Sequence, residues 1–318
     1  MTRNSPLKCR KNSAAAASLL ILFLIFLLLK NPSVAKECVS RALSLSASAL
    51  IPSLFPFMVL AEILVSCGFG SLFGQTLGRP VAALFGISRE GSAALCLGAL
   101  CGFPVGARMA LSLYDGGRIT KQECERLLSL ASFPSIAFLL STVGGALYQS
   151  PRFGRLLWLS CLTSSLVLGL ATRKKGASLK VAPSYSLPPL DVKIFPTAIA
   201  KATGAMLSIT AYVVFFGAIV GTLAQVLEPL ALPEVCRALL FGFFELSSGV
   251  SAAASLESHA LSALLCALTV GWSGLSIHCQ LLTLCDGRDL SLRFYFRARA
   301  AEAILCAAMA MIFAPFCF

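Results

Sequence analysis

One apolar stretch of the chain, GALCGFPVGARM at Gly98–Met109, contains residues that disrupt a helix and could bind a polar ligand. Pro104 has no N–H to donate and its ring obstructs a regular helix, while Gly102 and Gly106 let the backbone turn. A second half-helix that starts near this proline would present free N–H groups, which suit an anionic or polar ligand. The alternative is that the glycines, spaced four apart, let helices pack closely, and both roles can hold together.

A second stretch, GWSGLSIHCQ at Gly271–Gln280, places four polar side chains in an apolar segment. Facing lipid would be costly for them, so we expect them to face protein or water. The histidine could instead be a packing residue whose hydrogen bonds are satisfied within the protein. The stretch predicts a second polar lining, formed by Ser273, Ser276, His278 and Gln280.

Two carboxylates also lie in apolar surroundings, Glu62 in FMVLAEILV and Glu245 in FFELSSG. A carboxylate there is costly unless it is protonated or has a partner, and Arg108 and His278 are the candidate partners. Ser247 belongs to the second motif, where a loosened helix would free hydroxyls for the backbone or a ligand. Serine hydroxyls also commonly bond to carbonyls of their own helix, which would give them no further role.

Enzymatic chemistry has one candidate, the sequence GWSG, which matches the GxSG of rhomboid-like intramembrane serine proteases. Such a protease needs a general-base histidine on a neighbouring helix and donors to an oxyanion. His278 lies only five residues from Ser273, and the few asparagines all lie near the N-terminus. We therefore predict that the protein is not an enzyme and has no catalytic residues, no metal site and no cofactor. The absence of GxxxxGK[ST] also excludes nucleotide hydrolysis through a P-loop.

The composition places these residues in a lipid bilayer. Of 318 residues, 57% are hydrophobic and only 13% are charged, whereas about a quarter of a soluble domain is charged. The mean hydropathy is +0.84. The 26 Lys and Arg against 14 Asp and Glu are typical of membrane proteins with basic cytoplasmic loops. No basic stretch is interleaved with aromatic residues, so we expect no nucleic-acid partner.

The apolar runs predict an all-α, polytopic integral membrane protein with two pseudo-repeated halves. A polar segment rich in Pro and Ser, residues 173–196, separates a first membrane repeat with its connector helix, 44–172, from a second repeat, 197–318. The further apolar elements expected in these halves are 48–66, 91–113, 126–148, 155–172, 197–226, 237–254, 261–283 and 298–317.

Residues 1–43 form a separate N-terminal part. They contain a basic tail, a first transmembrane helix over 14–29 and the start of an interfacial helix over 34–47. Cleavage after the SVA at 33–35 is the alternative for this part, although the apolar run is longer than a usual signal core.

Each half contains one broken segment, and the two resemble each other weakly. CLGALCGFPVGAR from Cys96 aligns with CALTVGWSGLSIH from Cys266, and two broken segments at corresponding positions of two halves are typical of a transporter site. If both cross the membrane with the N-terminus inside, 13 Lys and Arg lie inside and 12 outside. If both dip in and return, 19 lie inside and 6 outside. The positive-inside rule favours seven crossings, two re-entrant hairpins and parallel halves, whereas full crossing would invert the halves.

Five motifs occur in an order typical of one family: SLFPFMVLAEIL, GFPVGARM, LYDGGRIT, ELSSGV and GLSIHCQ. Over residues 44–317 the chain resembles the YlbJ family of sporulation integral membrane proteins. That family belongs to the wider Gate or nucleoside-recognition group, with membrane regions of concentrative nucleoside transporters and ferrous-iron transporter B. Two departures are Phe103, where the family more often has tyrosine, and ASFPS at 131–135, which lacks an expected asparagine. The resemblance implies a first gate at Gly102, Pro104, Gly106 and Ala107 and a second at Gly274, Ser276, His278 and Gln280.

The resemblance implies a multi-pass protein of a bacterial inner membrane, with its N-terminus in the cytoplasm, that is needed for endospore formation. We expect a transporter or permease-like protein for a small polar solute, with a nucleoside-like molecule as one candidate. The alternative is a structural or assembly protein of the sporulating membrane, in which the spaced glycines serve helix packing. Expected partners are the lipid bilayer, the solute, and a second copy or other sporulation membrane proteins.

Overall fold

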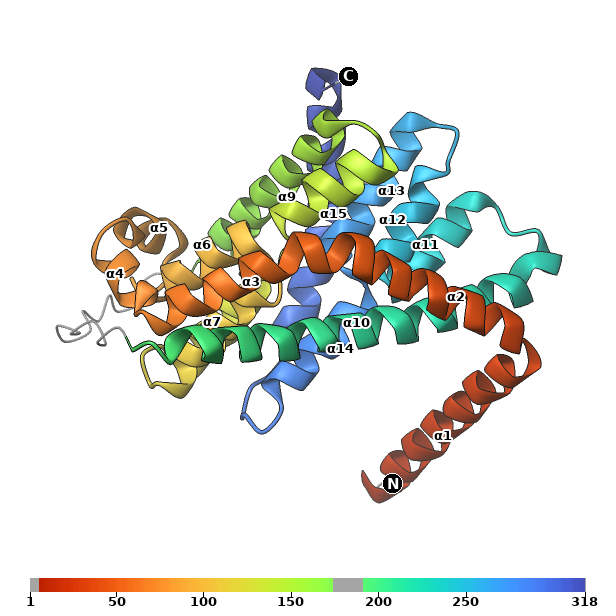
Figure 1. The fold of residues 1–318 in the computed structure, drawn as a ribbon, viewed down its shortest axis with the longest axis horizontal. Coiled ribbons are helices and arrows are strands. Elements are labelled where there is room, and N and C mark those ends of the chain that lie inside the picture. The colour runs from red at the N-terminus through yellow and green to blue at the C-terminus, as the bar shows by residue number, and fades with distance from the viewer. Residues whose placement is uncertain (1–5, 174–190, 318) are drawn as a thin grey trace, which may run out of the picture.

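The computed structural model describes residues 6–173 and 191–317, and within these ranges it contains helices and no strand. Five helical segments of these ranges are long and apolar enough to cross a membrane. The structure therefore confirms the predicted all-α, polytopic membrane protein (Figure 1). The polar connector predicted between the halves falls mostly on residues outside the described ranges. The five segments are Pro32–Ser66, Pro151–Ala171, Ile194–Leu230, His259–Cys285 and Arg293–Pro315.

A long helix opens the first half, after α1 (Pro6–Lys30). It consists of α2 (Pro32–Leu45), a π-helical segment at Ser46–Leu50 and α3 (Ile51–Ser66) in direct succession, 35 residues in all. The residues expected to form an interfacial helix, 34–47, are helical, but they do not form a separate element. The charged residues near its start suggested an interface, but the backbone continues as a helix from one segment into the next.

The first broken segment folds back on itself. α6 (Gly91–Cys101) and α7 (Val105–Asp115) are joined by residues 102–104. Gly98 and Gly106 lie so close that a Cβ on Gly106 would be 2.7 Å from the Cα of Gly98. Two helices joined by a short turn make such a contact only when they run side by side, so the return predicted for this segment is present.

The next helix is also broken but does not fold back. α8 (Lys121–Leu130) leads through residues 131–135 to a π-helical segment at Phe138–Leu147, and α9 (Pro151–Ala171) completes the half. Two short helices lie between α3 and α6, namely α4 (Phe69–Gln75) and α5 (Gly78–Phe85).

The second half contains the same order of elements. α10 (Ile194–Leu227) is the long helix, and it is followed by a hairpin of α11 (Glu234–Phe244) and α12 (Leu246–Ala254). Gly242 and Gly249 meet across this hairpin as the two glycines do in the first. The broken helix and the last helix then follow as α13 (His259–Trp272), α14 (Gly274–Cys285) and α15 (Arg293–Cys317).

The path of the second half corrects the predicted topology. Residues 261–283, expected to dip in and return, run on as the membrane-length helix α13–α14. Residues 237–254, expected to cross, form the hairpin. The count of basic residues could not distinguish the two paths, because the loop at 255–258 between them contains no Lys or Arg. Exchanging the roles of the two segments therefore leaves the charge distribution unchanged.

Equivalent helices of the two halves pack antiparallel. α2–α3 and α10 run along each other across the molecule (Figure 1). Cys38 near the start of α2 contacts Gly221 near the end of α10, while Glu62 near the end of α3 is 4.0 Å from Lys201 near the start of α10. The long helices of the two halves thus run in opposite directions, whereas the charge count favoured parallel halves. We call the end with Cys38 and Gly221 the α12 end, and the end with Glu62 and Lys201 the α7 end.

Candidate functional site

A small cavity of about 60 Å³ lies where the interrupted elements of both halves meet. The turns of both hairpins, both breaks of the crossing helices and the middles of both long helices contribute to its wall. Irregular backbone at membrane depth is tolerated only where protein buries it or a wet cavity meets it, so this convergence marks the candidate site. The wall is formed by Leu50, Leu54, Phe103, Pro134, Ser135, Phe138, Ile209, Val213, Glu245, Leu246, Ser247, Ser276, Ile277 and Gln280.

Three polar side chains in this wall have no hydrogen-bond partner among the described residues. They are the hydroxyls of Ser247 and Ser276 and the amide of Gln280. Ser276 is 1% exposed and Gln280 6% exposed, so both are removed from bulk solvent. Their polar atoms are therefore left to water or to a bound polar molecule in the cavity, because a polar group with neither costs free energy.

Of the described residues in the wall, Glu245 is the one that carries a carboxylate. Its two oxygens accept hydrogen bonds from the backbone N–H groups of Ser247 (2.9 Å) and Ser248 (2.6 Å). The side chain therefore caps the start of α12 and occupies the N–H groups that an anionic ligand would need. Its negative charge at the turn of the hairpin favours a neutral or cationic solute over an anionic one.

A larger groove of about 620 Å³ leads toward the cavity from the α12 end. Its walls are α2, α10 and the α11–α12 hairpin, and Val213, Glu245 and Ser247 line both the groove and the cavity. Ser251 and Ser255 continue the polar face of α12 toward the mouth. The charged side chains that line the groove beyond Glu245 are Glu37, Arg41, Glu234 and Arg237.

The glycines of the first break bring backbones together. A Cβ on Gly102 would lie 2.4 Å from the backbone nitrogen of Ser135, and one on Gly106 would lie 2.5 Å from the carbonyl oxygen of Ala131. The turn of the hairpin thus rests on the break of α8. Gly102 and Gly106 serve packing, and Pro104 sets the turn, while the neighbouring Phe103 provides the contact with the cavity.

Arg108 and Glu62 form the ion pair that the sequence suggested. The Arg108 Nη1 atom lies 3.0 Å from the Glu62 Oε1 atom and also donates to the carbonyl oxygen of Lys201 at 3.4 Å. The ammonium group of Lys201 lies 4.0 Å from the other carboxylate oxygen. These three residues connect α7, α3 and α10 at the α7 end, and none of them lines the cavity.

The second break divides its polar residues between two environments. Ser276 and Gln280 face the cavity, whereas His278 is fully buried on another face of α14. The His278 Nδ1 atom is 2.8 Å from the hydroxyl of Tyr295, and Trp272 packs edge-on against its ring. His278 therefore occupies a packing position, and neither cavity nor groove includes it.

Ser273 also faces away from the cavity. Its hydroxyl accepts a hydrogen bond from Arg299 at 2.6 Å, and the same guanidinium donates to the carbonyl oxygen of Gly271. Arg299 thus stabilises the last carbonyls of α13 at the break, where the negative end of the half-helix dipole lies. Ser273 and His278 have different partners and do not form the nucleophile–base pair that the GWSG motif would require.

The sequence did not single out Arg299 and Glu302, although both are 2% exposed on α15. The Glu302 carboxylate accepts a hydrogen bond from Ser164 of α9 at 2.8 Å. Both residues belong to the basic-to-apolar transition RARAAEAIL, which looks like an ordinary helix start. A charged pair three residues apart inside an apolar helix was the available signal.

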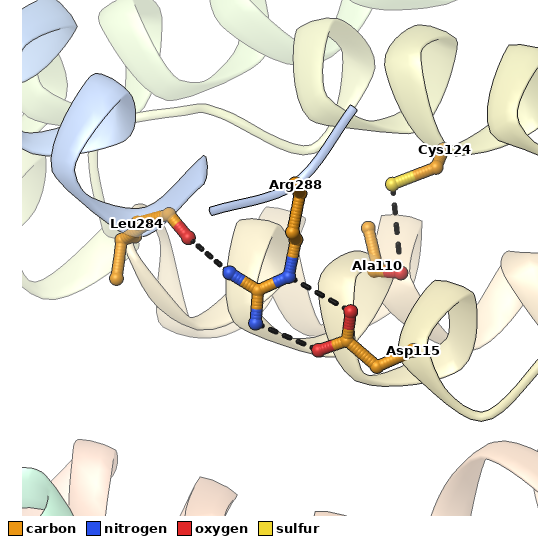
Figure 2. Close-up of polar contacts among 5 residues, drawn as sticks. All are labelled: Ala110, Asp115, Cys124, Leu284 and Arg288. Atoms are coloured by element: carbon orange, nitrogen blue, oxygen red, sulfur yellow. Dashed lines mark hydrogen bonds and ion pairs between the residues drawn. The ribbon is translucent and has the colours of Figure 1, made fainter. Parts of the chain in front are cut away.

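A second group of polar contacts joins the halves at the α7 end. Figure 2 shows Arg288 donating to both carboxylate oxygens of Asp115, at 2.8 and 2.7 Å, and to the carbonyl oxygen of Leu284 at 2.6 Å. Hydrogen bonding to Arg288 lowers the pKa of Asp115. Lys121 pairs with Asp289 in the same region, at 2.8 Å. The LYDG sequence at 113–116 and the similar LCDG sequence at 284–287 thus lie at neighbouring helix ends.

Comparison with curated proteins finds the sporulation integral membrane protein YlbJ of Bacillus subtilis (strain 168). It is 24% identical over 328 residues, and the match covers 92% of this chain and 80% of the relative. No family model matches the chain, and no solved structure matches it. The similarity therefore extends over nearly the whole chain, including most of the elements around the cavity.

Proposed function

We propose that the chain is a member of the YlbJ family of sporulation integral membrane proteins, to which it is similar over nearly its whole length, and that it is a permease-like protein that acts in endospore formation. In this proposal it lies in a bacterial cell membrane and binds a small polar solute at the central cavity. The solute is uncharged or cationic, and a nucleoside-like molecule is the candidate that the resemblance implies.

The supporting observation is the set of unpartnered polar side chains in the cavity wall. Ser247, Ser276 and Gln280 come from different helices, yet they converge where two hairpin turns and two helix breaks meet. Packing alone does not require polar groups at this point, because leucine or alanine would fill the space without a desolvation cost. A solute with hydroxyl or amide groups would satisfy them.

The groove provides a route to this site from one side. Basic residues concentrate at the α7 end, so the positive-inside rule supports placing that end and the N-terminus in the cytoplasm. The groove then opens on the opposite side of the membrane. Among the described residues that form the wall of the cavity there is no Lys or Arg, which supports a solute without phosphate groups.

The spaced glycines, which would support a purely structural role, contact other helices of the same chain. Gly98 faces Gly106, Gly242 faces Gly249, and Gly221 faces Cys38. These glycines bring helices of the same molecule together, so their spacing does not by itself indicate packing against another protein.

The accessibility of the site can be tested without knowing the solute. Ser247→Cys is expected to react with a membrane-impermeant maleimide added on the groove side of reconstituted protein. Ala253→Cys on the same helix is the matched control, because Ala253 is fully buried. Site-resolved mass spectrometry separates these positions from the native cysteines. Equal, negligible labelling of both variants would mean a dry interior and would contradict the proposal.

The role of the polar wall is tested in sporulating cells. The double variant Ser276→Ala and Gln280→Leu, which removes the hydrogen-bonding groups at nearly constant volume, is expected to abolish the function that the wild-type gene restores. Leu282→Ala is the control, because Leu282 is on the same helix and 48% exposed toward the surroundings. Full function of the double variant at unchanged protein level would favour the structural role instead.

A further inference from the structure

The two long helices contact each other at both of their ends, and the two contacts differ in kind. At the α12 end, Gly217 and Gly221 of α10 pack against Ala42 and Cys38 of α2. At the α7 end, the facing residues are Glu62 and Lys201. The cavity lies between these ends, since Leu50 and Leu54 of one helix and Ile209 and Val213 of the other border it.

Each end also has a hairpin beside the long helices. The α11–α12 hairpin stands next to the small residues, and there the groove of about 620 Å³ is open. The α6–α7 hairpin stands next to the charged residues, and from it Arg108 reaches Glu62 and the carbonyl oxygen of Lys201. Because the halves contain the same elements in opposite directions, these two places are structural equivalents.

We infer that the α7 end holds a second solute entrance, closed in this structure by the cluster of Arg108, Glu62 and Lys201. This inference rests on the proposed function, because an entrance matters only if a solute reaches the cavity. The closed entrance lies between α3, α7 and the first half of α10, and it is the counterpart of the open groove. Opening it requires Arg108 to leave Glu62.

The geometry of the cluster suits a contact that opens and closes. The side chains of Arg108, Glu62 and Lys201 are 27%, 13% and 51% exposed, so water can replace their partners when they separate. Partly exposed ion pairs contribute little stability, unlike buried ones whose separation leaves uncompensated charges. The buried charged side chains of Arg299 and Glu302 have hydrogen-bond partners on α13 and α9, and they suit a fixed element.

The face of α10 between the cluster and the cavity provides a reporter position. Lys201, Ala205 and Ile209 follow at intervals of four residues, which places them on one helix face. Ile209 borders the cavity and Ala205 is half-buried one turn before it. A cysteine at position 205 would therefore sense water that enters from the α7 end.

The test measures labelling of Ala205→Cys by an impermeant maleimide added at the α7 end of reconstituted full-length protein. Adding Glu62→Gln is expected to increase the labelling rate severalfold, up to about fivefold, as loss of a partly exposed ion pair allows. Asp115→Asn is the matched control, because it breaks another ion pair of α7, the one with Arg288, and leaves the cluster intact. That control should leave the labelling rate unchanged.

A charge exchange keeps the test informative if Glu62→Gln impairs folding. The double variant Glu62→Lys and Arg108→Glu restores an attractive pair and should return labelling to the low level, whereas Glu62→Lys alone should not. Unchanged labelling in Glu62→Gln and in Arg108→Ala would overturn the inference. Labelling of Ser251→Cys from the opposite side tests the groove separately, so failure of the entrance and failure of the solute site are distinguishable.

Discussion

The cap formed by Glu245 leads to a quantitative prediction about the α11–α12 hairpin. The carboxylate is 2% exposed and accepts hydrogen bonds from two consecutive N–H groups, those of Ser247 and Ser248. A hydrogen bond to a charged group contributes about 1.5–3 kcal/mol. Glu245→Gln keeps one acceptor oxygen, so we expect it to lower the free energy of unfolding by about 1.5–3 kcal/mol.

Removal of the whole side chain is expected to cost more. Glu245→Ala leaves both N–H groups without their acceptor, which gives an expected loss of about 3–5 kcal/mol, above the roughly 0.5–2 kcal/mol of solvent-exposed caps. Local hydrogen exchange across residues 245–254 and denaturant titration in detergent measure the two effects together. Glu234→Gln is the control, because Glu234 is exposed at the start of α11 in the same groove.

One result would refute this reasoning. If Glu245→Ala keeps the wild-type exchange rates of the Ser247 and Ser248 amides and loses less than about 1 kcal/mol, the carboxylate does not hold the turn. Water from the groove would then satisfy the N–H groups equally well. Glu245 would be available to bind a cationic solute directly, and its role would be recognition instead of structure.

Three further predictions concern the elements that hold the site in place. Gly106→Ala should lower the free energy of unfolding by about 1–3 kcal/mol, because the added Cβ would meet the Ala131 carbonyl. Gly204→Ala is the control, because its Cβ would meet nothing within 4 Å and should not lower stability. Thermal melts of the two variants can show the difference. Asp115→Asn should cost at most about 1 kcal/mol at neutral pH. Hydrogen bonding to Arg288 lowers the pKa of Asp115 from 3.8, so the stability that the ion pair contributes is present above pH 3.8 and is lost as the pH falls through the lowered pKa. Denaturant titrations at neutral pH and at a pH below the lowered pKa can show this loss. Arg299→Leu should cost about 3–5 kcal/mol in a denaturant titration, because the Gly271 carbonyl and the Ser273 hydroxyl lose a charged donor and the buried Glu302 carboxylate loses a nearby cation.

The sequence predicted the break in the first hairpin because its signals are local, whereas the return of the chain was predicted from the distribution of Lys and Arg. Pro104 and the glycines around it interrupt a helix through their own backbone properties, so no contact with a distant residue is needed to predict the break. The corresponding break at Glu245 has no proline and no glycine at the turn itself. The carboxylate of Glu245 caps the backbone there. From the sequence alone, this residue could be identified only as a carboxylate in an apolar segment.

The spacing of the polar residues in the second break indicates which of them share a helix face. Ser276 and Gln280 are four residues apart and share a face, and both reach the cavity. His278 lies midway between them, so the helical turn places it on a different face, against Tyr295. Which face meets the cavity depended on the packing of α15, and that packing involves residues distant in sequence.

The size of the cavity constrains how a permease of this shape would work. A space of about 60 Å³ holds very few water molecules and is smaller than most ligand pockets. A solute larger than that fits only if the hairpin turns at Phe103 and Leu246 move apart. Those turns are joined to their partners by backbone contacts at Ser135 and Gly274, so each hairpin would move together with the break it touches. In the proposed mechanism, binding would then shift the elements at both ends of the long helices, so that the open groove and the charged cluster would belong to one equilibrium.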